Sequence, residues 1–186
     1  MKRLFDLVLS VLVALFCALP ILVIAFAVRL TSNGPVLYWS DRVGQHNQIF
    51  RMPKFRTMNN GTPALATHLL KDPTAHLTTI GSFLRKSSLD ELPQLWSILK
   101  GDMSFVGPRP ALFNQFDLIE LRTKNDIHKL LPGLTGWAQI NGRDDLSIPD
   151  KVALDYEYLQ RRSFRFDCYI MWKTAIKVVN HDDVSH

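Results

Sequence analysis

The pattern of hydrophobic and polar positions begins with one long apolar segment. Residues 7–28 contain no charged side chain, and Ser10 and Pro20 are the interruptions in an otherwise apolar run. The run exceeds the length of about 18 residues at which membrane insertion is expected. The segment therefore predicts a chain that works at a membrane surface.

Three interpretations of this segment compete. A cleaved secretory signal is disfavoured, because its apolar region has only about 7–15 residues. Hydropathy alone favours a helix that crosses the bilayer. The third interpretation is a re-entrant helix that breaks at Pro20, which lacks a backbone N–H and clashes with the preceding turn. Basic residues at both ends, Lys2 and Arg3 before the run and Arg29 after it, argue against crossing, because cations collect on the cytoplasmic side.

The remaining pattern indicates one domain. Two β-rich runs, residues 36–43 and 49–55, are joined by a polar turn and predict a hairpin. Helices are predicted over residues 64–70, 80–86 and 89–99. The fold class is therefore α/β, mostly helical with a small β-hairpin.

Two more helices are expected near the end of the chain. The first begins at Pro149, which suits a first helical turn, and runs to about residue 160. Ser163 is the predicted cap of the second. This last helix mixes aromatic and basic residues, as interfacial amphipathic helices do. A core-facing helix with a solvated basic edge explains the same mixture.

Charge adds an anionic partner to this picture. The net charge is +5 and the sequence pI is about 9.4. Nucleic acid, a phosphorylated substrate and acidic lipid headgroups all fit such a charge. The two cysteines form no disulfide framework and suit a reducing cytosolic face, and the six histidines show no metal-ligand spacing.

The first candidate chemistry lies at residues 88–91. Ser88 followed three positions later by Glu91 has the form of a capping box, which places Asp90 in the first helical turn. Unpaired N–H groups there stabilise a carboxylate and attract phosphate. Asp90 is thus a candidate nucleophile on phosphorus. Acidic residues are also common in first turns simply because they complement the helix dipole.

Arg109 is the second candidate, because it lies between Pro108 and Pro110. The prolines confine the backbone to an extended shape, so the guanidinium is presented from a stiff platform. Guanidinium is also the side chain best suited to bidentate phosphate binding.

Further cations are expected at the same site. Lys54 and Arg56 end the predicted hairpin, and Arg85 precedes the predicted capping box. A diphosphate requires several such charges, and a divalent ion commonly bridges its oxygens with a carboxylate such as Asp90 or Glu91 as anchor. A solvated basic face is the alternative for any one of these cations.

The third candidate segment covers residues 131–143. It combines three glycines with Trp137, Gln139, Asn141 and Arg143. Such a composition suits a loop that approaches a ligand closely and stacks on it or hydrogen-bonds to it, and a nucleotide would fit. Glycine-rich segments also simply turn.

Together these motifs resemble the bacterial sugar transferase family, the monotopic phosphoglycosyl transferases. The resemblance extends from the membrane segment to about residue 179, and the short length resembles the minimal members. The motifs that carry it are KFRTM at 54–58, SLDELPQL at 88–95, KGDMSFVGPRP at 100–110 and PGLTGWAQINGR at 132–143.

The resemblance implies a reaction. A sugar-1-phosphate moves from a UDP-sugar to polyprenol (undecaprenyl) phosphate with release of UMP, as the first membrane step of bacterial glycan or glycoconjugate assembly. Asp90 matches the nucleophile that forms a covalent phosphosugar intermediate, and Glu91 matches its partner beside Mg²⁺. Arg109 matches the phosphate-binding arginine. The other expected substrate-binding residues are Lys54, Arg56, Arg85, Gln139 and Arg143.

The resemblance also implies a location. Residues 1–30 would be a re-entrant helix with both ends on the cytosolic side of the bacterial inner membrane. Residues 31–186 would be a cytosolic catalytic domain that contacts membrane lipid and no nucleic acid. The family breaks its helix at Ser-Pro, whereas this chain has Leu19-Pro20, and His46-Asn47 stands where many members carry a glycine.

Two other functions use the same residues. A membrane-tethered basic module would bind phosphorylated ligands without catalysis, and it would tolerate Asp90→Asn. A glycosidase would use Asp90 and Glu91 as its carboxylate pair. Adjacent residues of a helix point about 100° apart, which is a poor arrangement for flanking one glycosidic bond.

Overall fold

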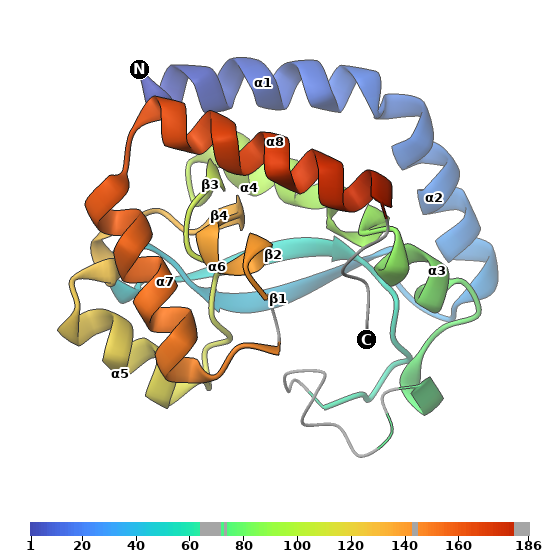
Figure 1. Cartoon of the computed structure of the whole chain (residues 1–186). Helices are drawn as coiled ribbons and strands as arrows, with labels where there is room; N and C mark the ends of the chain where they lie inside the picture. Colours follow the sequence, from blue (N-terminus) through green and yellow to red (C-terminus); the bar gives the residue numbers. More distant parts are fainter. Residues whose placement is uncertain (64–71, 73, 143–144, 181–186) are drawn as a thin grey trace.

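The computed structural model describes residues 1–63, 72, 74–142 and 145–180. It begins with two helices, α1 (Lys2–Phe16) and α2 (Ala18–Thr31), which meet at a 62° bend (Figure 1). The bend lies at Cys17, so the predicted break at Pro20 was wrong by three residues. Pro20 has no N–H to bond the carbonyl four residues earlier, so the helix ends ahead of it and Pro20 falls in the first turn of α2.

Both ends of this bent pair are attached to the same globular body. Arg3 donates to the carbonyls of Ile98 (2.5 Å) and Leu99 (2.8 Å). Lys2 Nζ donates to the Val106 carbonyl at 3.0 Å and to Asp167 Oδ2 at 2.5 Å. The first turn of α1 is therefore held to the rest of the protein by two cationic side chains. The end of α2 is followed by the first strand of the hairpin.

The hairpin is confirmed. Strand β1 (Leu37–Val43) pairs antiparallel with β2 (Ile49–Phe55), with Leu37 opposite Phe55 and Val43 opposite Ile49. The connecting turn contains η1 (Gln45–Asn47), where His46 and Asn47 have φ values of 55° and 59°. Such positive φ values favour glycine.

The helices after the hairpin follow the prediction in part. Helix α3 (Gly81–Lys86) is confirmed, and the helix expected over residues 89–99 is divided into a 3₁₀ helix, η4 (Leu89–Gln94), and α4 (Leu95–Lys100). Pro93 within η4 has no N–H to continue an α-type ladder. The helix expected over residues 64–70 lies outside the described residues.

A second sheet has two short parallel strands. Strand β3 (Ser104–Val106) pairs with β4 (Gly133–Thr135). The remaining elements are η3 (Thr74–His76), α5 (Phe116–Lys124), η5 (Ile127–Lys129), α6 (Trp137–Ile140), α7 (Ile148–Arg161) and α8 (Phe164–Asn180). Ser147 caps α7, and Ser163 Oγ accepts a hydrogen bond from the Phe166 N–H, so both predicted terminal helices and the Ser163 cap are confirmed.

Two hydrophobic clusters hold these elements together. The larger lies among α4, β3, α7 and α8 and includes Ile98, Met103 and Ile170, which are fully buried. The smaller joins α2 to the hairpin and α3 through Val28, Phe55 and Leu84. Helix α2 thus shares a core with the elements around η4.

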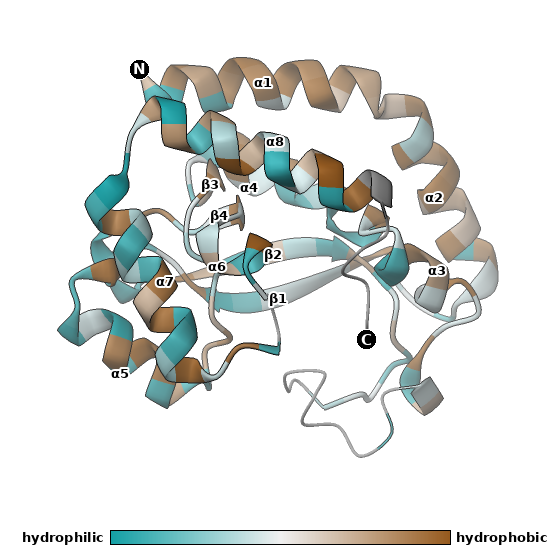
Figure 2. Ribbon diagram, viewed as in Figure 1, coloured by the Kyte–Doolittle hydropathy of each residue, from teal (hydrophilic) through white to brown (hydrophobic). Residues whose placement is uncertain are grey.

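Helices α1 and α2 are hydrophobic along most of their length (Figure 2), and many of their large side chains are exposed. Its exposed large side chains are Leu4, Val8, Val11, Leu12, Leu15, Phe16, Leu19, Leu22, Val23, Phe26 and Leu30. Within the described residues no single helix has the length and hydropathy to cross a membrane, but α1 and α2 reach that threshold as a pair. The architecture is α/β and mostly helical, as predicted.

Candidate active site

Asp90 and Glu91 lie side by side on η4, but without the predicted capping box. Ser88 has a left-handed backbone (φ 56°, ψ 14°) and makes no capping hydrogen bond to any described residue. A capping side chain requires an extended backbone at its own residue. The Ser88 prediction was therefore wrong, and the Glu91 carboxylate takes other partners.

Those partners are two cations. Lys54 Nζ lies 2.7 Å from Glu91 Oε1, and Arg109 Nη2 lies 2.9 Å from the same oxygen. Lys54 Nζ is also 3.9 Å from Asp90 Oδ2. Strand β2 supplies Lys54 and the segment after β3 supplies Arg109, so three parts of the chain meet at the two carboxylates.

The environment separates the acidities of the two carboxyl groups. Burial raises the pKa of Asp90, and the negative charge of Glu91 adds to this effect, although Lys54, Arg85 and Arg109 oppose it. Burial alone would also raise the pKa of Glu91. The charges of Arg109 and Lys54 and the hydrogen bonds they donate outweigh burial and hold the Glu91 pKa well below its usual range. The surroundings therefore make Glu91 the stronger acid of the pair and Asp90 the weaker one.

Burial and the neighbouring carboxylates have opposite effects on the pKa of Lys54. Desolvation lowers the pKa of Lys54, while the charges of Glu91 and Asp90 act in the opposite direction. The Lys54 ammonium is a compact positive charge beside two carboxylates. A phosphate oxygen could bind this ammonium in place of a carboxylate oxygen.

Of the other predicted substrate-binding residues in the described part of the chain, Arg85 acts on Asp90, whereas Arg56 and Gln139 donate to backbone carbonyls. Arg85 acts on the pair, because its charge lowers the pKa of Asp90. Arg56 is buried and donates to the carbonyl of Asn33 (3.0 Å), in the turn between α2 and β1. Gln139 Nε2 donates to the Leu134 carbonyl at 3.2 Å, and its buried Oε1 has no hydrogen-bond partner among the described residues. Arg143 lies outside those residues.

The glycines of the third segment serve close packing of the chain against itself. A Cβ at Gly133 would lie 2.1 Å from the Gly107 nitrogen, and a Cβ at Gly136 would lie 2.1 Å from the Gly107 oxygen. Real Cβ atoms do not approach backbone so closely. These glycines let the backbone of residues 133–136 touch the backbone that leads into Arg109.

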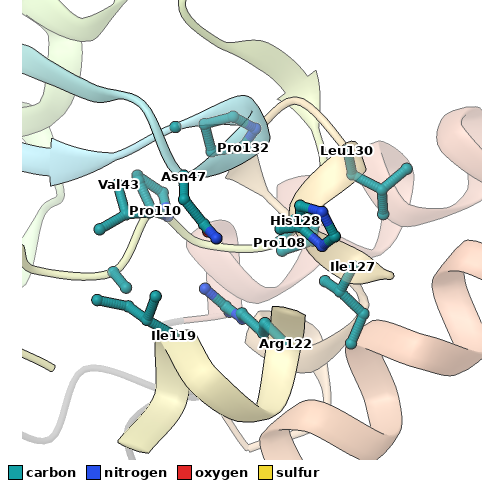
Figure 3. Close-up of a pocket in the computed structure, with 12 residues that line it drawn as sticks. Val43, Asn47, Pro108, Pro110, Ile119, Arg122, Ile127, His128, Leu130 and Pro132 are labelled. Atoms are coloured by element: carbon teal, nitrogen blue, oxygen red, sulfur yellow. The ribbon is translucent and has the colours of Figure 1, made fainter. Parts of the chain in front are cut away.

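Two arginines that the sequence analysis did not identify donate hydrogen bonds to the backbone at Arg109 and Pro110. Arg122 Nη1 donates to the Arg109 carbonyl at 2.8 Å, and Arg42 Nη1 donates to the Pro110 carbonyl at 3.2 Å. Arg122 also lines a small pocket with Pro108 and Pro110 (Figure 3). No motif marks either residue, because their partners lie far away in the sequence.

The donor set of the site suits a hard cation. Among the described residues no group of three or more His, Cys, Asp or Glu side chains could hold a metal ion. Asp90 and Glu91 together supply two neighbouring carboxylates. Mg²⁺ commonly takes one or two carboxylates, retains waters and completes its shell with phosphate oxygens. The pair therefore fits Mg²⁺ that arrives together with a phosphorylated substrate.

Comparisons with known proteins identify a family. The family model described as bacterial sugar transferase matches residues 1–181. A Bacillus subtilis (strain 168) protein named uncharacterized sugar transferase EpsL is 41% identical over 181 residues, which cover 96% of this chain and 87% of that protein.

Two longer relatives carry more specific names. The UDP-glucose:undecaprenyl-phosphate glucose-1-phosphate transferase of Escherichia coli (strain K12) is 42% identical over 193 residues, covering 95% of this chain and 40% of the relative. The undecaprenyl-phosphate galactose phosphotransferase of Salmonella typhimurium (strain LT2) is 36% identical over 200 residues, covering 98% of this chain and 41% of the relative. The chain thus spans less than half the length of each of these two proteins.

Proposed function

Because the chain belongs to the bacterial sugar transferase family and is a transferase, we propose that it moves a sugar-1-phosphate from a UDP-sugar to undecaprenyl phosphate and releases UMP. The names of the E. coli and Salmonella relatives support the acceptor, and the E. coli name supports the donor class. The observation that carries the proposal is the buried Asp90, beside a Glu91 that holds Lys54 and Arg109. In glycan assembly this is the first step at the membrane.

The first half of the reaction uses Asp90 as nucleophile. An Asp90 carboxylate oxygen attacks the phosphorus that carries the sugar, the new O–P bond forms, and the bond from that phosphorus to the bridging oxygen breaks. UMP leaves with the bonding electron pair. In the second half an oxygen of undecaprenyl phosphate attacks the same phosphorus and releases Asp90 as a carboxylate. The product is undecaprenyl diphosphate sugar.

The surrounding charges suit this displacement. Phosphoryl transfer depends mainly on positioning and on neutralising charge. Arg109 and Lys54 would bind the diphosphate oxygens, and Glu91 would hold both cations in place while the substrate is absent. Mg²⁺ held by Asp90 and Glu91 would supply further neutralisation of phosphate charge.

The same proposal includes a membrane arrangement. Residues 1–30 would enter the cytosolic leaflet of the bacterial inner membrane and return, which leaves residues 31–186 on the cytosolic face. The 62° bend, the exposed apolar side of α1 and α2, and the attachment of Lys2 and Arg3 to the globular body support this arrangement. A helix that crossed the bilayer would separate its two ends, whereas both ends here join one body.

A donor-only reaction tests the proposal. The purified protein is mixed with Mg²⁺ and a panel of UDP-sugars without undecaprenyl phosphate. The correct donor should release UMP in a burst no larger than the enzyme concentration, and the protein should gain the mass of one sugar phosphate. Asp90→Asn should abolish both signals, whereas Glu91→Gln should slow them.

Adding undecaprenyl phosphate to the loaded enzyme should discharge the adduct as lipid-linked sugar. Release of UMP only when both substrates are present, with no adduct after a rapid quench, would replace the covalent route by direct transfer. Lack of turnover with every donor would leave the chain as a module that binds phosphorylated ligands.

A further inference from the structure

The backbone on both sides of Arg109 is held through its carbonyl oxygens. Pro108 and Pro110 have no N–H, so these residues can be held through the backbone only as acceptors. Four consecutive carbonyls accept hydrogen bonds from separate parts of the chain: Pro108 from the Gly133 N–H (2.9 Å), Arg109 from Arg122 (2.8 Å), Pro110 from Arg42 (3.2 Å) and Ala111 from the Val43 N–H (2.9 Å). The carbonyl of Arg109 itself is thus bound by a guanidinium.

That guanidinium is fixed on its other side by a buried carboxylate. Arg122 Nε and Nη2 both donate to Asp155 Oδ2, at 2.9 and 2.6 Å. The two side chains are only 9% and 2% exposed. Because the guanidinium group is planar and its donors point in fixed directions, the bond to Asp155 determines where Nη1 meets the Arg109 carbonyl. Figure 3 shows Arg122 beside the small pocket that Pro108 and Pro110 also line.

From this geometry we infer that Arg122, oriented by Asp155, is a positioning residue for Arg109. The Arg109 guanidinium contacts Glu91 Oε1 at 2.9 Å, while the Arg109 carbonyl accepts a hydrogen bond from Arg122 at 2.8 Å. The inference rests on the proposed function, in which Arg109 binds the phosphates of the donor. Arg122 acts through Arg109 and contacts no substrate.

A purely structural role is the alternative. Arg122 lies on α5 and Asp155 lies on α7, so the pair also joins two helices. A buried ion pair is weak support for stability, because desolvation of the two charges offsets much of their attraction. The two roles differ in one respect: a positioning residue loses its effect on the rate when Arg109 is already absent.

A double-mutant cycle measures this difference. The variants are Arg122→Gln, Arg109→Ala and the double substitution, assayed for transfer from UDP-glucose or UDP-galactose to undecaprenyl phosphate. Arg122→Gln alone should lower the rate by at least about tenfold, because small misplacements of a binding group are costly. In the Arg109→Ala background the same substitution should change the rate by less than about twofold.

Two further variants keep the test independent of folding. Arg122→Met with Asp155→Leu removes both charges together, which is tolerated far better than leaving one charge buried alone, and it also removes the bond to Arg109. Val152→Ala is the matched control, because Val152 is a buried residue of α7 in the larger hydrophobic cluster and its truncation destabilises the core without changing a charge. Val152→Ala should leave the transfer rate within about twofold of wild type.

Hydrogen exchange gives a readout without substrate. The Gly133 and Val43 N–H groups bond to the carbonyls of Pro108 and Ala111. Their exchange should accelerate in the Arg122→Met/Asp155→Leu protein and stay unchanged in Val152→Ala. Unchanged exchange in both proteins, or an equal rate loss from Arg122→Gln with and without Arg109, would overturn the inference. Absence of the covalent adduct in the wild-type protein would instead refute the proposed mechanism and leave the exchange result to decide the role of Arg122.

Discussion

Replacing Lys54 by Met is expected to move the acid limb of the pH–rate profile to higher pH. Burial raises the pKa of Asp90, and the charge of Lys54 is the largest influence that opposes this rise. Methionine keeps an unbranched side chain and removes the charge. Asp90 must be ionised to attack phosphorus, so a higher Asp90 pKa means that a higher pH is needed for the reaction.

The distance sets the size of the effect. Two unit charges separated by 3.9 Å, as Lys54 Nζ and Asp90 Oδ2 are, interact by about 4 kcal/mol at an effective dielectric constant of about 20. The interaction favours the ionised form of Asp90 in the wild-type protein, and Lys54→Met removes it. On the acid limb the rate falls by about tenfold for each pH unit, so the shift is readily measured.

Glu91→Gln provides the opposite perturbation at the same place. The negative charge of Glu91 raises the pKa of Asp90, so removing it should lower that pKa and move the acid limb to lower pH. The substitution also removes the carboxylate that Lys54 and Arg109 share. The charges of these two cations, no longer neutralised by Glu91, should lower the pKa of Asp90 further. Two neighbouring substitutions should therefore shift one limb in opposite directions.

The assay is single-turnover release of UMP, followed from about pH 5 to about pH 9 with donor and excess enzyme. Lys100→Met is the matched control, because it removes the charge of an exposed lysine that pairs with Asp102. Its acid limb should coincide with that of the wild type. Shifts of Lys54→Met and Glu91→Gln in the same direction, or no shift in either, would refute the assignment of the limb to Asp90.

Three other predictions concern single features. Arg109→Lys keeps the charge but loses the planar fork, so turnover should fall by at least about tenfold, and near wild-type rates would show that Arg109 contributes only a diffuse charge. Gly133→Ala should lower the free energy of unfolding by about 1–3 kcal/mol, measured by thermal or denaturant unfolding in detergent, because the new Cβ would meet the Gly107 backbone. In a variant without the native cysteines, cysteines added ahead of Met1 and at Gln48 should both react with an impermeant label only from the cytosolic side, and labelling from opposite sides would refute the re-entrant arrangement.

The sequence predicted those features that depend on local patterns. The hairpin followed from two β-rich runs around a polar turn, and the Ser163 cap from a serine ahead of an aromatic and basic helix. Helix α7 followed from a proline at a suitable first-turn position. In each case neighbouring residues alone supply the main physical cause, so a single sequence was enough.

Features that depend on distant contacts were not predictable in the same way. Ser88 and Glu91 match a capping box, but α3 ends at Lys86, two residues before Ser88, and the chain turns at Ser88 through a left-handed backbone conformation. Two cations from distant elements then bind the Glu91 carboxylate. Arg56 was expected to bind substrate together with Lys54, and in the structure its guanidinium donates to the carbonyl of Asn33.

The break in the membrane segment is an intermediate case. Proline correctly indicated that a helix would be interrupted, because its missing N–H is a local property. The bend nevertheless lies at Cys17, since the carbonyl that loses its partner is four residues ahead of the proline. A Ser-Pro pair was therefore not required for a 62° bend in this chain.

The position of Arg109 depends on elements that lie far from it in the sequence. Pro108 and Pro110 limit the backbone shape, but the position of the segment comes from β1, α5 and the strand at Gly133. Asp90 lies on the 3₁₀ helix η4, which packs against β2. The Arg122–Asp155 pair contacts the segment that carries Arg109, whereas η4, which carries the proposed nucleophile Asp90, packs against β2. A change in this pair is therefore expected to displace Arg109 more than Asp90. Activity should therefore be sensitive to substitutions of Arg122 on α5 and of Asp155 on α7, and this sensitivity should disappear once Arg109 is removed.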